Sequence, residues 1–128
     1  MSFEPNSLLR YQNHNPMAQE RVGFLLGPEK EIVEVDNICS DPVNGFCVKG
    51  SDLLKYVDTA TGSWHTHPGS SSNFTIEDQK SFLSYPHLSH YIIGIDGVSC
   101  YVIKNGKVLV ATESLSPRDV EVDPRRPD

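Results

Sequence analysis

Apolar residues along this chain form short runs, interrupted by glycine, proline and other turn-forming residues. The first run, residues 21–26, stops at a Gly-Pro pair and predicts a buried strand. Residues 32–35 are mostly β-branched and predict its hairpin partner. Turns at Asp96-Gly97 and Asn105-Gly106 predict an antiparallel meander in the second half of the chain. Four further strands are expected, at residues 62–67, 91–95, 98–103 and 107–111.

Two short helices are expected in the first half of the chain. One covers residues 6–14, with Asn6 or Ser7 as its cap. The other covers residues 51–57 and begins at Ser51 in the same way. A chain of 128 residues suits one domain, because single cores commonly form at about 100–150 residues. The pattern therefore predicts a single α/β domain.

A third helix is expected from its cap, Thr75, to about Tyr85. Within it, Asp78, Phe82 and Tyr85 recur at i, i+4 and i+7, so the aspartate shares a face with apolar residues. A carboxylate turned inward among apolar groups needs a cation or hydrogen-bond donors. This indicates that Asp78 is a metal ligand. Thr75 and Asp78 also fit a capping box, and both interpretations can hold together.

Two histidines come just before this helix, in His65-Thr66-His67-Pro68. Histidines at i and i+2 of an extended segment point to the same side, and Asp78 follows eleven residues after the second. Two neutral imidazoles and one carboxylate suit a zinc ion with a fourth position left for water, as in a catalytic site. Taken alone, the histidines fit a strand end that hydrogen-bonds the backbone equally well.

Glu20 precedes the apolar run 21–26 and is the candidate general base for such a water. A glutamate ahead of a strand is usually solvated, and Glu29, Glu31 and Glu34 offer competing carboxylates nearby. The remaining histidines, His14, His87 and His90, are expected at the surface or at strand edges. Trp64 alternates with the two histidines and is expected in the core. The small polar loop 69–73 is expected to be flexible and to line a cleft, although a plain turn fits it equally well.

The stretch from His65 to Asp78 resembles the motif of JAMM (MPN-type) metalloproteases. That motif reads His-Ser/Thr-His-Pro, a short variable loop, then Ser/Thr-x-x-Asp. Glu20 and the following Val-Gly-Phe-Leu-Leu-Gly resemble the glutamate and apolar strand that lie upstream in the family, and the resemblance spans about residues 6–112. It implies a mixed, curved sheet flanked by helices. It also implies Zn²⁺ bound by His65, His67 and Asp78, proton transfer by Glu20, and stabilisation of the reacting carbonyl by Thr75, where many members have serine.

The resemblance implies a zinc-dependent metallopeptidase with one zinc per chain, acting on a peptide or isopeptide bond of a protein or peptide substrate. The segment after Asp78 is too short for the second insertion with which similar eukaryotic deubiquitinases grip ubiquitin, so the chain resembles compact bacterial, archaeal or phage members. The preferred substrate is the C-terminus of a ubiquitin-like or sulfur-carrier protein. A peptide of the cell wall or of a phage tail is the alternative, and a catalytically silent scaffold is a third, less favoured one.

The composition of the chain limits the kinds of partner and the cellular compartment that we expect. A net charge of −6 argues against nucleic acid, which selects basic surfaces. No apolar stretch reaches the roughly 20 residues of a membrane span, and the N-terminus lacks the pattern of a signal peptide. The three cysteines show no C-x-x-C spacing, which predicts reduced, mostly buried thiols in a cytoplasmic protein. A Cys39–Cys47 disulfide across the intervening turn remains open.

The domain itself is expected to cover residues 1–112. Beyond it, residues 113–128 are polar, charged and interrupted by three prolines, which predicts a flexible C-terminal tail. Oligomeric state, cleavage specificity and any activating partner are not decided by the sequence.

Overall fold

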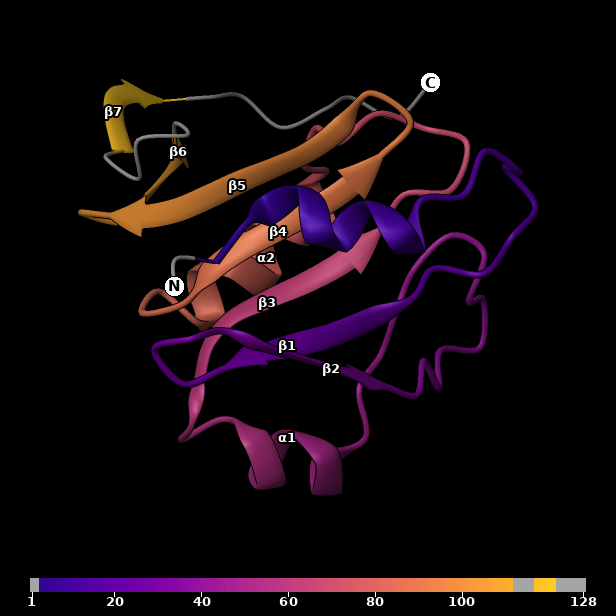
Figure 1. The fold of residues 1–128 in the computed structure, drawn as a ribbon, viewed down its shortest axis with the longest axis horizontal. Coiled ribbons are helices and arrows are strands. Elements are labelled where there is room, and N and C mark those ends of the chain that lie inside the picture. Colours follow the sequence, from indigo (N-terminus) through magenta and orange to yellow (C-terminus); the bar gives the residue numbers. More distant parts are fainter. Residues whose placement is uncertain (1–2, 112–116, 122–128) are drawn as a thin grey trace.

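The computed structural model describes residues 3–111 and, as backbone, residues 117–121 (Figure 1). Within these residues one sheet of seven strands has the order β2-β1-β3-β4-β5-β6-β7. Helices lie on both sides of it. The elements in chain order are η1 (Pro5–Tyr11), β1 (Val22–Leu26), β2 (Glu31–Val35), α1 (Gly50–Tyr56), β3 (Ala60–Thr66), α2 (Ile76–Ser84), β4 (Ser89–Gly94), β5 (Gly97–Lys104), β6 (Lys107–Ala111) and β7 (Pro117–Glu121).

The sheet is mixed, because β3 and β4 run parallel while the other described neighbours run antiparallel. Parallel strands cannot be joined by a tight turn, so the chain must cross over the sheet between them. Helix α2 supplies this crossover on the face opposite η1 (Figure 1). The prediction of an α/β domain is confirmed, and the crossover places the C-terminal end of β3 next to the start of α2.

The predicted meander is confirmed as β4, β5 and β6. Asn105 and Gly106 both have positive φ, 55° and 75°, as a two-residue hairpin turn of type I′ requires. The preceding turn differs from the prediction by one residue, since Gly94 pairs with Gly97 and leaves Ile95 and Asp96 as the loop. The Asp96 carboxylate accepts a hydrogen bond from the Ser72 backbone N–H at 2.8 Å, a contact distant in sequence that favours this placement.

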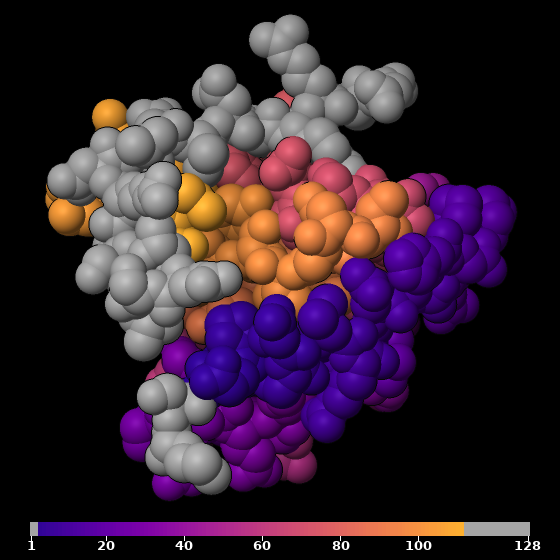
Figure 2. Space-filling view, turned by 45° about the horizontal axis from the view of Figure 1, so that its top comes forward, coloured from indigo at the N-terminus to yellow at the C-terminus, as the bar shows by residue number. Residues whose placement is uncertain are grey.

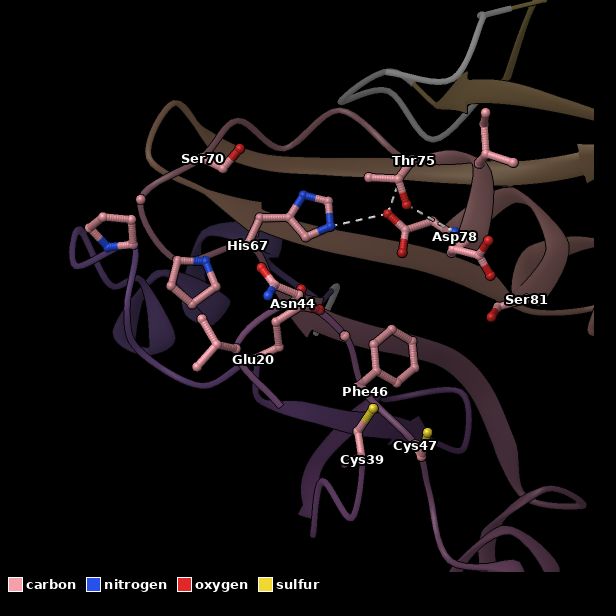
Figure 3. Close-up of a pocket in the computed structure, with 17 residues that line it drawn as sticks. Glu20, Cys39, Asn44, Phe46, Cys47, His67, Ser70, Thr75, Asp78 and Ser81 are labelled. Carbon is pink, nitrogen blue, oxygen red and sulfur yellow. Dashed lines mark hydrogen bonds and ion pairs between the residues drawn. The ribbon is translucent and has the colours of Figure 1, made fainter. Parts of the chain in front are cut away.

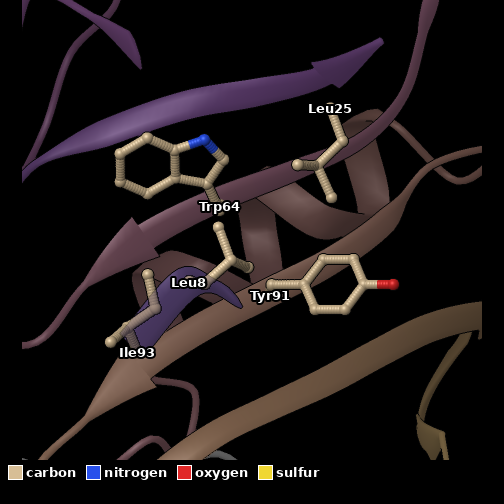
Figure 4. Packing of buried hydrophobic residues seen from close by; sticks show 5 residues of the cluster. All are labelled: Leu8, Leu25, Trp64, Tyr91 and Ile93. Atoms are coloured by element: carbon tan, nitrogen blue, oxygen red, sulfur yellow. The ribbon is translucent and has the colours of Figure 1, made fainter. Parts of the chain in front are cut away.

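One face of the sheet is covered by η1, which lies across β4 and β5 (Figure 2). Its Leu8 packs on Leu25, Trp64, Tyr91 and Ile93, and all five side chains are buried (Figure 4). Trp64 is fully buried, as the sequence predicts. Because side chains alternate along β3, the neighbouring His65 points to the opposite face, where α2 lies.

The first two helices begin earlier than predicted. The N-terminal element is a 3₁₀ helix that starts at Pro5 and ends at Tyr11, without a side-chain cap. Proline is favoured at the first positions of a helix, because its fixed φ suits them and its missing N–H would have no helical partner. Helix α1 likewise begins at Gly50, so Ser51 lies inside it and caps nothing.

The predicted tail is corrected in part. Pro117–Glu121 form strand β7, which pairs antiparallel with β6. Strand β6 would otherwise present unpaired backbone groups at an edge, and a proline is tolerated at the first position of such a strand. Residues 113–116 and 122–128 lie outside the described residues. Among the described helices, none is long and apolar enough to cross a bilayer.

His90 is buried in β4, which corrects its expected place at the surface or at a strand edge. Its Nε2–H donates to the carbonyl of Tyr85 at 3.0 Å, and its Nδ1 accepts from the hydroxyl of Ser63 at 2.6 Å. The ring also stacks on Phe82, with centroids 4.3 Å apart. Burial lowers the pKa of His90 from 6.5 to about 4, so the folded chain holds this imidazole neutral.

This burial makes stability depend on pH. Below pH 6.5 the unfolded chain protonates His90 while the folded chain does not, so the free energy of unfolding should fall until the pH reaches about 4. At pH 5 the loss should be about 2 kcal/mol. Urea denaturation at pH 7 and pH 5 measures it. In His90→Gln the decrease should be smaller by that amount, whereas His14→Gln, at an exposed position, should behave as wild type. An unchanged decrease in His90→Gln would contradict the assignment.

Candidate metal centre

The two predicted histidines lie at the C-terminal end of β3, where the chain leaves the sheet for the crossover. His65 is in the strand, and His67 follows its last residue. Asp78 lies in the first turn of α2, so the crossover brings it back over this strand end (Figure 3). All three side chains are buried. The structure thus brings together the three residues that the sequence predicts as ligands.

Their donor atoms point at one another. The Nε2 atoms of His65 and His67 are 3.1 Å apart. The Asp78 carboxylate has one oxygen 3.0 Å from the His65 nitrogen and the other 3.0 Å from the His67 nitrogen. Three donors at this separation can contact a single ion at zinc–ligand distances of about 2.0–2.2 Å. Two imidazoles and one carboxylate are also the donor types that zinc accepts, so these residues fit the ion.

Neighbouring groups orient these donors. His67 Nδ1–H donates to the carbonyl of Ser71 at 2.9 Å, which directs the Nε2 lone pair toward the cluster. Asp78 Oδ2 accepts from the backbone N–H of Thr75 at 2.9 Å, and Thr75 Oγ1 accepts from the backbone N–H of Asp78 at 3.1 Å. The predicted capping box is therefore confirmed. The carboxylate that caps the helix is the one that faces both histidines.

The electrostatics of the cluster follow from this contact. Burial alone would raise the pKa of Asp78, but the facing imidazoles of His65 and His67 hold it well below its usual range. Burial favours the neutral form of His65, yet the charge and hydrogen bond of Asp78, with a weaker effect of Glu20, raise its pKa. A buried anionic carboxylate of this kind needs positive charge beside it, which a cation supplies.

Glu20 joins the cluster, as the sequence predicts. Its carboxylate and the ring nitrogens of His65 and His67 lie within 4.8 Å of one another. The competing carboxylates lie elsewhere, since Glu29 and Glu31 are exposed and Glu34 forms an ion pair with Arg21 at 2.6 Å. Glu20 lies just before β1, half-buried, at the cleft described below.

Asn37 holds the backbone around Glu20, and sequence reasoning missed it. Its side-chain N–H groups donate to the carbonyls of Glu20, at 2.8 Å, and Gly45, at 2.9 Å. The Glu20 N–H in turn donates to the carbonyl of Pro42 at 2.7 Å. Asn37 therefore joins Glu20 to the loop of residues 37–47. Nothing in the local sequence marks this asparagine, because its partners lie 17 residues before it and 8 after it.

A cleft with a volume of about 820 Å³ opens over the cluster (Figure 3). Residues 43–47 form one wall, and Thr75, Glu77 and Ser81 form the other. His67 and Asp78, though largely buried, line the cleft between the two walls. A second, more apolar cavity of about 230 Å³ adjoins it, and Phe46, Cys47 and Ser81 line both. A cleft of this size accommodates a segment of a polypeptide or a small molecule.

The loop 69–73, expected to be flexible, is hydrogen-bonded to the meander, at the turn between β4 and β5 and at β5 itself. Ser70 O accepts from the N–H of Ile95 at 2.8 Å, and Ser72 O accepts from the hydroxyl of Tyr101 at 3.0 Å. The loop also lies so close to Gly94 that a Cβ there would come within 2.3 Å of the Ser72 nitrogen. These contacts correct the expected flexibility, while Gly69 and Ser70 line the cleft as expected. The contacts also fix the carbonyl that orients His67.

Comparison with known proteins finds a similar fold among solved structures, but no match to a family model or a curated sequence. No protein-family model matches the chain, and no curated protein matches it in sequence. Among solved structures, protein DSY2949 from Desulfitobacterium hafniense is similar, with a TM-score of 0.60 over 81% of this chain and 82% of that chain. The two sequences are 21% identical, so the likeness concerns the fold alone.

Thr75 offers a direct test of the helix start that carries Asp78. Thr75→Ala removes the hydroxyl that accepts from the Asp78 N–H and should lower the free energy of unfolding by about 1 kcal/mol. Thr75→Ser keeps that hydroxyl and should remain close to wild type. Urea denaturation compares the three proteins. Equal losses in both variants would show that the methyl group matters rather than the cap.

Proposed function

We propose that this protein is a zinc-dependent metallopeptidase of the JAMM (MPN) type, which hydrolyses a peptide or isopeptide bond. The observation that carries the proposal is the convergence of His65, His67 and Asp78, with Glu20 beside them, where His67, Asp78 and Glu20 line an open cleft. These residues also match the motif of that family in type and spacing. A scaffold without activity would have no need for the complete set of three metal ligands and a general base.

The metal would be held by His65, His67 and Asp78, whose donors already face one another. When bound, zinc lowers the pKa of a coordinated water from 15.7 to about 7 and polarises a substrate carbonyl. The His67 hydrogen bond to Ser71 and the capping box at Asp78 hold the donors in place. A site with three protein ligands leaves room for water, as catalytic zinc sites require.

Glu20 would act as the general base. Its carboxylate lies at the cluster and at the cleft, where it can accept a proton from the attacking water. It would then deliver that proton to the leaving amine. Because its backbone is fixed at both its N–H and its carbonyl, Glu20 is positioned before substrate binds.

Thr75 would stabilise the developing charge on the substrate carbonyl. Its hydroxyl oxygen accepts from the Asp78 N–H, which orients the group while leaving it able to donate. Thr75 lines the cleft, so a carbonyl oxygen bound there would receive that hydrogen bond. Asp78 thus supports both the metal and this hydroxyl.

As substrate we propose the extended C-terminal segment of a ubiquitin-like or sulfur-carrier protein. The cleft lies between two walls, and its volume of about 820 Å³ suits a segment of a polypeptide chain rather than a whole folded domain. Incubation with tagged ubiquitin-like proteins tests this class. Parallel incubation with purified peptidoglycan and with phage-tail peptides tests the cell-wall and tail peptides that form the alternative.

Metal content tests the ligands without any substrate. The purified protein should contain about one zinc per chain, and His65→Ala or Asp78→Ala should lose most of it. His87→Ala, at an exposed position, is the matched control and should retain zinc. Elemental analysis measures all four proteins. Unchanged zinc in both ligand variants would remove these residues from the site.

Glu20→Gln separates catalysis from metal binding. Glutamine keeps the shape of the side chain but cannot accept the proton, and a general base contributes about 10²–10⁴-fold in rate. The variant should therefore fold, retain zinc and lose nearly all cleavage of a substrate that wild type cleaves. Glu29→Gln, at an exposed carboxylate, should keep its activity. A Glu20→Gln variant as fast as wild type would assign the base to another carboxylate.

A further inference from the structure

Two cysteines face each other in the wall of the cleft. The backbone N–H groups of Cys39 and Cys47 both donate to the same side-chain oxygen of Asn37, each at 3.1 Å. The two nitrogens are therefore no farther apart than twice that distance. The N–H of Ile38 also donates to the carbonyl of Cys47 at 2.9 Å, so the two segments run side by side. These two hydrogen bonds hold the Cα atoms of Cys39 and Cys47 to at most about 9 Å apart, close to the range of about 4.4–6.8 Å that disulfides need.

Figure 3 shows the sulfur atoms of Cys39 and Cys47 below Phe46, and the two thiols interact with each other. The hydrogen bond with the Cys39 thiol is the main reason why the pKa of Cys47 is raised. Both residues are free thiols, Cys47 exposed and Cys39 half-buried, so a small oxidant in the cleft reaches them. Their exposure corrects the expectation of buried thiols. Cys100, the remaining cysteine, packs instead beside the Trp64 cluster, where burial raises its pKa to about 11.

We propose that Cys39 and Cys47 form an oxidation site, at which a peroxide converts the two thiols into a reversible disulfide. The thiolate of Cys47 attacks the peroxide, which yields a sulfenic acid and one water or alcohol. The sulfur of Cys39 then displaces the hydroxyl as a second water, and the disulfide forms. Two thiols are oxidised and one peroxide is reduced. A small thiol or a dithiol restores the reduced pair by exchange.

The bond would change the wall of the cleft. The ring closed by the disulfide contains Asn44 and Phe46, whose side chains line the cleft, and Pro42, which accepts the hydrogen bond of Glu20. A disulfide holds its sulfur atoms about 2.05 Å apart, closer than two thiols in contact, so the loop must shift when the bond forms. We expect slower hydrolysis after oxidation, a consequence that rests on the proposed function.

Mass spectrometry of the full chain tests the site without a substrate. The reduced protein is treated with hydrogen peroxide, and its intact mass and non-reduced peptides are compared with those of an untreated sample. We expect the loss of two hydrogen atoms, a peptide pair joined through Cys39 and Cys47, and full reversal by dithiothreitol. Two free thiols after treatment, or a bridge that involves Cys100 or a second chain, would overturn the proposal.

Three serine variants serve as controls. Cys100→Ser should form the bridge as wild type does, whereas Cys39→Ser and Cys47→Ser should not. The side-chain oxygen of Asn37 accepts hydrogen bonds from the backbone N–H groups of both cysteines and so holds them together. Asn37→Ala should therefore form the disulfide more slowly. A bridge that forms at the wild-type rate in Asn37→Ala would contradict the geometric basis. Oxidation should be faster at alkaline pH, because the raised pKa leaves little thiolate near neutrality.

The consequence for activity is measured separately, with each protein compared with itself before and after oxidation. Wild type should lose activity on oxidation and regain it on reduction, with its zinc content unchanged, while Cys47→Ser, which lacks the thiol that attacks the peroxide, should not respond. A disulfide with undiminished cleavage would refute the regulatory effect alone. If wild type cleaves no substrate even when reduced, the proposed function fails while the oxidation site stands on the mass measurement.

Discussion

The buried carboxylate of Asp78 is the contact on which the rest of this structure depends. It faces His65 and His67 at 3.0 Å and also accepts from the backbone N–H of Thr75, so it joins the end of β3 to the start of α2. A charge in this position is destabilising unless each of these partners is present. The fold of the crossover and the chemistry of the cluster therefore share one requirement. A change that weakens the helix start also misplaces the candidate ligand.

The topology explains why the cluster lies where it does. The sheet is antiparallel on either side of the one described pair of parallel neighbours, and α2 makes the crossover that this pair requires. Side chains at the C-terminal end of β3 therefore meet the first turn of α2. Ile95, just after β4, and Tyr101 of β5 hold the connecting loop through hydrogen bonds to Ser70 and Ser72. The meander thus acts at a distance on His67, because it fixes the loop whose Ser71 carbonyl orients that imidazole.

Structural features that depend on residues close together in the sequence could be predicted. The Asn105-Gly106 turn, the Thr75 cap and the burial of Trp64 each follow from local conformational preference or from alternation along a strand. The failures depend on contacts between distant segments. The shifted turn at Asp96 is held by Ser72, and the burial of His90 depends on Ser63 and on a helix that covers it. Strand β7 needs the edge of β6, which no pattern within its own residues reveals.

Different segments support the candidate ligands and the candidate base. The ligands rest on β3, α2 and the loop between them, whereas Glu20 is held from the loop 37–47 through Asn37 and Pro42. Changes in that loop should therefore reach Glu20 without removing any ligand of the proposed metal. The same asparagine that fixes the backbone of Glu20 also brings Cys39 and Cys47 together. A bond between these sulfurs would consequently act on the base and on the cleft wall, while the two histidines and Asp78 keep their own supports.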